Sequence, residues 1–117
     1  MGYQRSTGQW ADAENVTLHA NANLTASANT TPVETDRGTL RATLTVANLQ
    51  GDTTVDVDIE TRKDSNDAWR VVGSFTQATA DGAERLCFAG CDREVRAAIT
   101  MAGSSPDADV EIVGEFA

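Results

Sequence analysis

The chain has 117 residues, enough to bury one hydrophobic core, so we expect a single domain. Eighteen acidic residues against nine basic ones give a formal net charge of −9, and a surface this acidic repels nucleic-acid phosphates. No stretch approaches the roughly 20 apolar residues of a transmembrane helix, and the N-terminus lacks the apolar region of a signal peptide. We therefore expect no nucleic-acid or membrane partner, and folding in a cytoplasm.

The first residues are polar, contain glycine and show no hydrophobic period. They predict a flexible N-terminal arm at 1–13, followed by one β-sandwich domain at 14–117. Trp10 stands in this polar stretch, and an aromatic side chain in a polar tail often docks into a partner. The alternative is that Trp10 packs against its own sandwich. We take Tyr3, Arg5 and Trp10 as candidate partner-binding residues.

From residue 15 onward, apolar and polar residues alternate with a period of two, which indicates strands with one buried face. Alternation predicts a first strand at 15–20, and a weaker version of the pattern predicts another at 21–28. The segment 29–38 contains Pro32, which cannot donate to a central ladder, and therefore predicts a loop or a short edge segment.

The alternation is strict over 39–48 and 53–62, which predict two strands. Their connection contains Gly51 and Asp52, residues typical of a connection between antiparallel strands. The second strand places Asp56, Asp58 and Glu60 on its outward face. Such an acidic row is the usual solvated face of an antiparallel sheet and discourages aggregation between edges.

Further strands are predicted at 69–77, 84–88, 94–101 and 110–113, the last one ending at Gly114. Trp69 and Phe75 lie six residues apart and share one face unless Gly73 forms a bulge. Their default role is to anchor the core.

The strand pattern predicts an all-β fold. About seven to nine short strands, spaced roughly 8–12 residues apart, are typical of an antiparallel β-sandwich or a jelly roll. We therefore expect a jelly-roll-like sandwich that carries an N-terminal arm.

Catalytic chemistry has little support in the sequence, and we expect a protein that is not an enzyme. His19 is the one histidine, and no Gly-x-Ser-x-Gly elbow occurs. Paired carboxylates are plentiful, but a glycosidase also needs a cleft with aromatic sugar platforms, and aromatic residues are scarce. Oxygen ligands at Asp64, Asn66 and Asp67 suggest a turn rather than a calcium loop, because the EF-hand spacing is absent. No cofactor is expected.

Two cysteines, Cys87 and Cys91, flank a short Phe-Ala-Gly segment. In a tight hairpin they could form a disulfide, but in a protein folded in the cytoplasm two reduced thiols that serve as small apolar residues are favoured. A zinc site would need two more Cys or His ligands.

Three arginines, Arg85, Arg93 and Arg96, fall around one predicted hairpin. They can pair with outward acids of a neighbouring strand or with those of a neighbouring subunit, and the sequence does not separate these cases. We add Arg93 and Arg96 to the candidate partner-binding residues.

Four segments of the chain resemble small β-sandwich virion proteins of tailed bacteriophages. The resemblance extends over about half of the chain, from Val55 onward, and is a pattern of strands and turns rather than a catalytic motif. Its matching segments are Thr54–Thr61, Asp67–Gln77 with its Trp and Ser-Phe-Thr-Gln, Phe88–Ala97 with its Gly-x-Asp-Arg-x-x-Arg hairpin, and Val110–Glu115. Cys91 stands where an aliphatic residue is expected, which favours a buried thiol.

The resemblance implies a structural role in a virion assembled in a host cytoplasm. It suggests a capsid decoration or cement protein, with the major capsid protein or other virion subunits as partners and homo-oligomers on the particle. A neck or tail subunit is the first alternative. A carbohydrate-binding sandwich for host adhesion is the second, and it would need exposed aromatic residues, for which only Trp69 and Phe75 are available.

Overall fold

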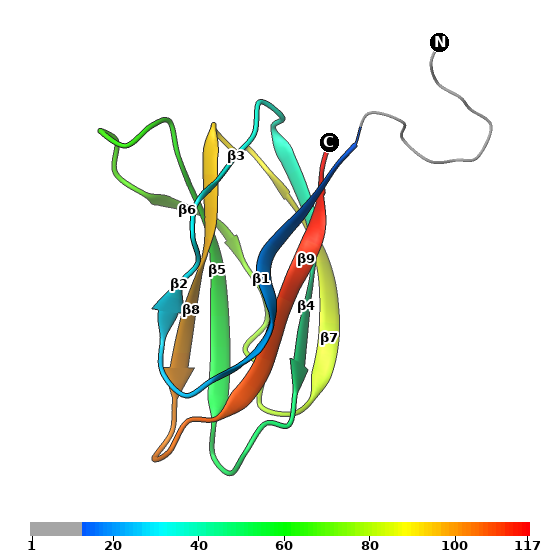
Figure 1. The fold of residues 1–117 in the computed structure, drawn as a ribbon, viewed down its shortest axis with the longest axis vertical. Helices are drawn as coiled ribbons and strands as arrows, with labels where there is room; N and C mark the ends of the chain where they lie inside the picture. The colour runs from blue at the N-terminus through cyan, green and yellow to red at the C-terminus, as the bar shows by residue number, and fades with distance from the viewer. Residues whose placement is uncertain (1–12) are drawn as a thin grey trace, which may run out of the picture.

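The computed structural model describes residues 13–117, which form nine strands and no helix (Figure 1). In chain order the strands are β1 (Glu14–Leu24), β2 (Ala28–Asn29), β3 (Val33–Glu34), β4 (Thr39–Ala47), β5 (Thr54–Arg62), β6 (Arg70–Ser74), β7 (Gly82–Ala89), β8 (Glu94–Ala102) and β9 (Ala108–Phe116). All pairings are antiparallel. The prediction of an all-β antiparallel fold is confirmed.

Two sheets pack face to face. The first sheet has the order β1-β9-β4-β7, and the second has the order β2-β8-β5-β6, with β3 also paired to β8. If β2 and β3 are counted as one interrupted edge strand, eight strands remain, and strands that are neighbours in sequence mostly lie in opposite sheets. This order is that of a jelly roll, as predicted.

The core lies between the two sheets and consists of the inward residues of each strand. In β4 and β5, buried and half-buried residues alternate without exception, as the sequence pattern predicts. The largest fully buried side chains are Phe116, Leu40, Ile59, Ile99 and Ile112. Phe75 and Phe88 meet edge to face inside this core, with their ring centroids 5.2 Å apart.

The N-terminal half departs from the prediction in its first two strands. The segments 15–20 and 21–28 are mostly one long strand, β1, whose register shifts between Thr17 and His19 and again between His19 and Ala22. These irregularities explain the weak alternation in the sequence. The segment 29–38 contains β3, so the alternative of a short edge segment is correct there.

The connection at residues 48–52 does not form a hairpin. It carries the chain from β4 in one sheet to β5 in the other, and the two strands do not pair. Strict alternation gives both strands one buried face, which is equally true for hairpin partners and for strands that face each other across a core.

The prediction that the last strand ends at Gly114 is wrong. β9 continues through Phe116, whose side chain is buried. The backbone of Phe116 pairs with Glu14 of β1 on one side and with Leu40 of β4 on the other. The described chain therefore begins and ends at the same end of the sandwich (Figure 1). Among the described residues no helix is long and apolar enough to cross a membrane.

Candidate functional site

The most organised polar site lies on the outer face of the sheet that contains β5 and β8. Outward residues of these strands lie opposite each other as Glu60 with Arg96 and Arg62 with Glu94. The Nε atom of Arg96 donates to Glu60 Oε1 at 2.8 Å, and that of Arg62 donates to Glu94 Oε1 at 2.7 Å. We call these four residues, together with Trp69, the Trp69 cluster.

Trp69 is half-buried against both arginines of the cluster. The guanidinium carbons of Arg62 and Arg96 each lie 4.3 Å from the centroid of its ring, which is the geometry of a cation–π contact. The indole shelters the two ion pairs from water, so the charged side chains of Arg96 and Glu60 expose only 20% and 17% of their surface. The result is a polar surface whose charges are paired with each other within the chain.

A bulge places Trp69 on this face. In the pairing of β6 with β5, Gly73 lies opposite Ile59 and Val71 lies opposite Glu60, so Val72 is an extra residue. Trp69 therefore faces outward although Phe75 faces the core. The expectation that both residues anchor the core is correct for Phe75 and wrong for Trp69.

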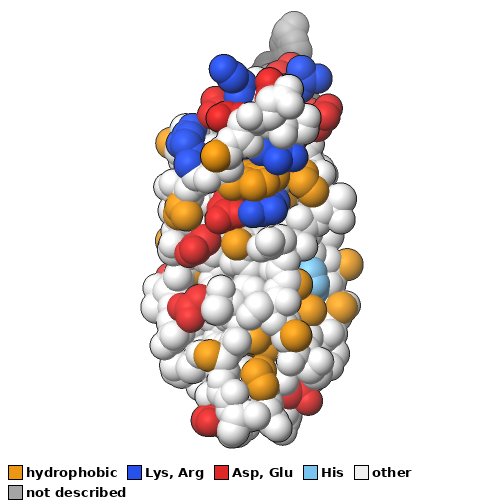
Figure 2. Space-filling model, turned by 90° about the vertical axis from the view of Figure 1, so that its left-hand side faces the viewer, with side chains coloured by type: hydrophobic (Ala, Val, Ile, Leu, Met, Phe, Trp, Pro, Cys, Tyr) orange, Lys and Arg blue, Asp and Glu red, His pale blue; other side chains and the backbone are white. Residues whose placement is uncertain are grey.

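The cluster borders an exposed apolar side chain. Val71 lies opposite Glu60 in the register, and among the described residues it is the one large hydrophobic side chain that is exposed, at 52%. Figure 2 shows that the charged side chains on this side of the molecule gather toward one end, around an apolar patch. Tryptophan and arginine are enriched in protein contact surfaces, and the exposed Val71 adds apolar area beside them.

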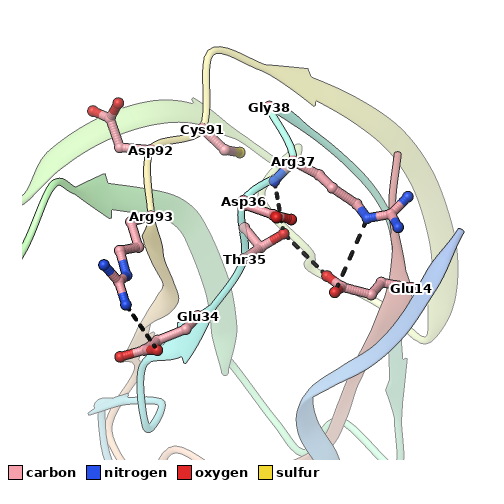
Figure 3. Close-up of a pocket in the computed structure, with 9 residues that line it drawn as sticks. All are labelled: Glu14, Glu34, Thr35, Asp36, Arg37, Gly38, Cys91, Asp92 and Arg93. Carbon is pink, nitrogen blue, oxygen red and sulfur yellow. Dashed lines mark hydrogen bonds and ion pairs between the residues drawn. The ribbon is translucent and has the colours of Figure 1, made fainter.

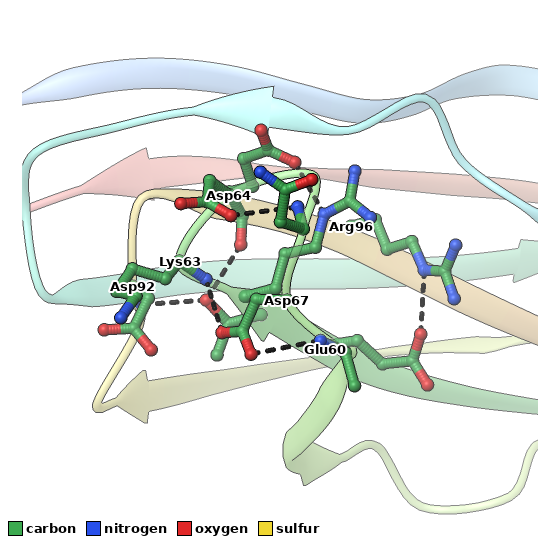
Figure 4. Close-up of polar contacts among 11 residues, drawn as sticks. Glu60, Lys63, Asp64, Asp67, Asp92 and Arg96 are labelled. Carbon is green, nitrogen blue, oxygen red and sulfur yellow. Dashed lines mark hydrogen bonds and ion pairs between the residues drawn. The ribbon is translucent and has the colours of Figure 1, made fainter.

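Hydrogen bonds hold the loops around the cluster (Figure 4). The hydroxyl of the buried Thr61 donates to the carbonyl of Glu94 at 2.8 Å and accepts from the backbone N–H of Asp92 at 2.7 Å. Arg70 donates to Asp92 and to the carbonyl of Gly90, both at 2.9 Å. The turn between β7 and β8 is therefore hydrogen-bonded to both β5 and β6.

The turn at 63–67 carries the carboxylates that could suggest calcium. Asp64 accepts the backbone N–H of Asn66 at 2.9 Å, and Asp67 accepts that of Lys63 at 3.1 Å (Figure 4). Each carboxylate thus closes the turn itself, in agreement with the turn interpretation. No group of three His, Cys, Asp or Glu side chains that could hold a metal ion occurs within residues 13–117.

A second polar site lines an open hollow at the end of the sandwich where the described chain begins (Figure 3). Glu14 accepts a hydrogen bond from the Thr35 hydroxyl at 3.0 Å and lies 4.0 Å from Arg37, so it links β1 to the segment before β4. Arg93 lies across the hollow, 3.8 Å from Glu34.

The structure separates the sequence-predicted site residues. Tyr3, Arg5 and Trp10, and with them nearly the whole predicted arm at 1–13, lie outside the described residues. Arg93 lines the hollow of Figure 3, whereas Arg96 belongs to the Trp69 cluster. Arg85, Arg93 and Arg96 each meet an acidic residue of the same chain: Glu115 at 3.8 Å, Glu34 at 3.8 Å and Glu60 at 2.8 Å.

Both cysteines are free thiols, and they differ in environment. Cys91 is half-buried and packs against the core, and burial raises the pKa of its thiol. Cys87 lies exposed on β7 opposite Arg41. The interpretation as small apolar residues therefore fits Cys91 and is wrong for Cys87.

His19 contacts the backbone rather than other catalytic groups. Its Nδ1 lies 2.9 Å from the carbonyl oxygen of Val110, and because a carbonyl only accepts, this nitrogen is the donor. The ring therefore helps to hold β1 on β9. Sequence reasoning missed Arg62, Glu94 and Val71, because only the register of three strands brings them next to Trp69.

Comparison with known proteins does not assign a family. No protein-family model matches the sequence, and a search of curated proteins gives no match. The class of protein that fold and site define is thus a small all-β two-sheet sandwich with a structured polar outer face.

Proposed function

We propose that the protein is a non-enzymatic virion structural protein, and specifically a capsid decoration protein that binds the head lattice of a tailed bacteriophage. The observation that carries the proposal is the surface formed by the Trp69 cluster and the exposed Val71. Its tryptophan and its two arginines belong to the residue types that most often concentrate binding energy in protein interfaces.

The charged groups of the cluster and the histidine of the described chain support a binding role rather than catalysis. The charged side chains of the cluster neutralise each other, and His19 is occupied by a backbone carbonyl. The jelly-roll order is one that viral capsid domains and lectins share, so it agrees with the resemblance described above without distinguishing these classes.

Repeated binding sites on a capsid would make a small contact surface sufficient for stable attachment. A capsid presents many identical sites, and homo-oligomers on such a lattice convert weak single contacts into high avidity. The two ion pairs that lie beside Val71 would form part of the polar rim of each contact and help to exclude water from it.

The test uses particles that lack the protein and purified protein added back to them. We expect cosedimentation, and cryo-EM density of one jelly-roll domain at regular positions on the head. Val71→Glu should weaken binding at least about tenfold, because it places a charge at the apolar centre of the contact. Thr100→Glu is the matched control, since Thr100 is exposed and projects from the same face of β8. Absence of the protein from particles would overturn the proposal.

Two alternative functions would each be indicated by a different outcome of this test. Density confined to the neck or tail would make the protein a subunit of those structures. The other alternative, a carbohydrate-binding module, is supported by the outward position of Trp69, although this ring is half-buried and already contacts two arginines. Glycan binding that Trp69→Ala abolishes, in a protein that does not bind particles, would establish that function instead.

A further inference from the structure

The two sheets have four edges, and three of them carry features that oppose further strand pairing. β1 has two register irregularities, β6 has five residues and a bulge, and β2 and β3 have two residues each. Bulges and very short strands are the usual protection of sheet edges.

The fourth edge, β7, has no bulge and is not short, and the one protective feature it carries is an inward-facing charge, Glu84, opposite Leu44. It pairs with β4 over eight consecutive residues without a register shift, and it contains no proline and no lysine. Figure 1 shows β7 at the border of the molecule, and within the described residues no strand pairs with its other side. Its backbone is a regular template for one more antiparallel strand.

We infer that β7 is a self-association surface, at which a second copy of this chain adds its own β7 by a two-fold axis through Leu86. Two four-stranded sheets would then join into one continuous eight-stranded sheet. The inference does not depend on the proposed virion function.

The side chains of β7 favour this register. A two-fold axis at Leu86 places Arg85 opposite the partner's Cys87 and Ala83 opposite the partner's Ala89, all on the outward face. A register centred on Arg85 would bring two arginines face to face, which like-charge repulsion disfavours.

The inward apolar side chain on the axis agrees with this register, and the inward Glu84, which Thr76 holds by two hydrogen bonds, would lie opposite the partner's Phe88. Leu86 is only partly buried at the open side of the core, although it packs against the core residues. In the Leu86-centred register, the two copies of Leu86 meet on the axis and cover each other. The apolar surface that each monomer leaves exposed at this edge is thereby buried.

The outward position of Cys87 allows a charge test that leaves the core untouched. Cys87→Lys would place a cation opposite the partner's Arg85, twice in each dimer, and we expect a dissociation constant about tenfold higher. Cys87→Glu would place an anion there and lower the dissociation constant, although it makes two already acidic copies more acidic. Because net charge alone would predict the reverse order, these opposite changes in the dissociation constant distinguish local charge pairing from an effect of net charge.

The measurement is sedimentation equilibrium of the full chain under reducing conditions, with Thr17→Lys and Thr17→Glu as controls. Thr17 is exposed on β1, at the opposite edge of the same sheet. Wild-type dimers with opposite responses to the two Cys87 substitutions, and no response to those at Thr17, would support the inference. A wild-type monomer at concentrations of several hundred micromolar would overturn it. So would a dimer that both Cys87 substitutions weaken, since this indicates a register centred on Cys87.

Discussion

Gly114 in β9 lies directly against the backbone of Arg41 in β4, and a β-carbon at position 114 would collide with the Arg41 carbonyl oxygen and with Ala42. The neighbours are backbone atoms in the middle of a sheet, so they cannot move aside without breaking the pairing of β9 with β4. Glycine is therefore the residue that allows β9 to continue to its buried end at Phe116.

Gly114→Ala should destabilise the domain by about 3 kcal/mol, because the added methyl group forces two central strands apart. Chemical denaturation followed by circular dichroism measures this change. Gly38→Ala is the control, because a β-carbon at Gly38 meets no atom within 4 Å. We expect the control to stay within about 0.5 kcal/mol of wild type. Equal stability of the two variants would contradict the close packing at Gly114.

The ion pair between Glu60 and Arg96 should contribute more than an exposed pair does. A double-mutant cycle of Glu60→Gln and Arg96→Met should give a coupling free energy of about 1 kcal/mol, because Trp69 shields the pair from solvent. The same cycle at Arg85 and Glu115, where the arginine side chain is 65% exposed and the distance is 3.8 Å, should give less than about 0.3 kcal/mol. Similar coupling free energies for the two ion pairs would show that Trp69 does not shield the Glu60–Arg96 pair from solvent.

The two thiols should react with alkylating reagents at different rates. Cys87 is exposed and should be labelled first, whereas burial raises the pKa of the Cys91 thiol and keeps it protonated at neutral pH. Mass spectrometry of time-resolved labelling distinguishes the two sites. Faster labelling of Cys91 would contradict its position against the core.

The raised pKa of Cys91 also gives the sign of a pH effect on stability. The unfolded thiol loses its proton at the ordinary pKa, whereas the folded thiol loses it only at a higher pH. The contribution of Cys91 is therefore fully present below the ordinary thiol pKa and is lost as the pH rises through the folded value. Cys91→Ala should remove this part of the alkaline loss of stability.

Asp109 should titrate below the ordinary range of an aspartate. The amide of Asn48 donates to it at 2.7 Å and that of Asn23 at 3.1 Å, and these hydrogen bonds lower the pKa of the carboxyl group. The stabilisation is present above the ordinary pKa and is lost as the pH falls through the lowered folded value. Asn48→Ala should raise the pKa toward its ordinary value in an NMR titration, whereas Asn66→Ala, in a distant turn, should leave it unchanged.

The sequence by itself determined the strands whose faces differ most. Strict alternation in β4, β5 and β8 specified their length and their buried side, because a one-residue error would expose every core residue. The acidic outward row of β5 followed from the same pattern, as did the turn closed by Asp64 and Asp67.

Only the tertiary structure decided which strands are neighbours. The alternation of β4 and β5 is the same whether they form a hairpin or face each other across the core, and long-range register placed them in different sheets. The bulge at Val72 then turned Trp69 outward, and the pairing of β5 with β8 brought Arg62 and Arg96 beneath its ring. The contacts of Trp69 with Arg96, of Glu60 with Arg96 and of Arg62 with Glu94 join residues far apart in the chain, so no local pattern could reveal the candidate site.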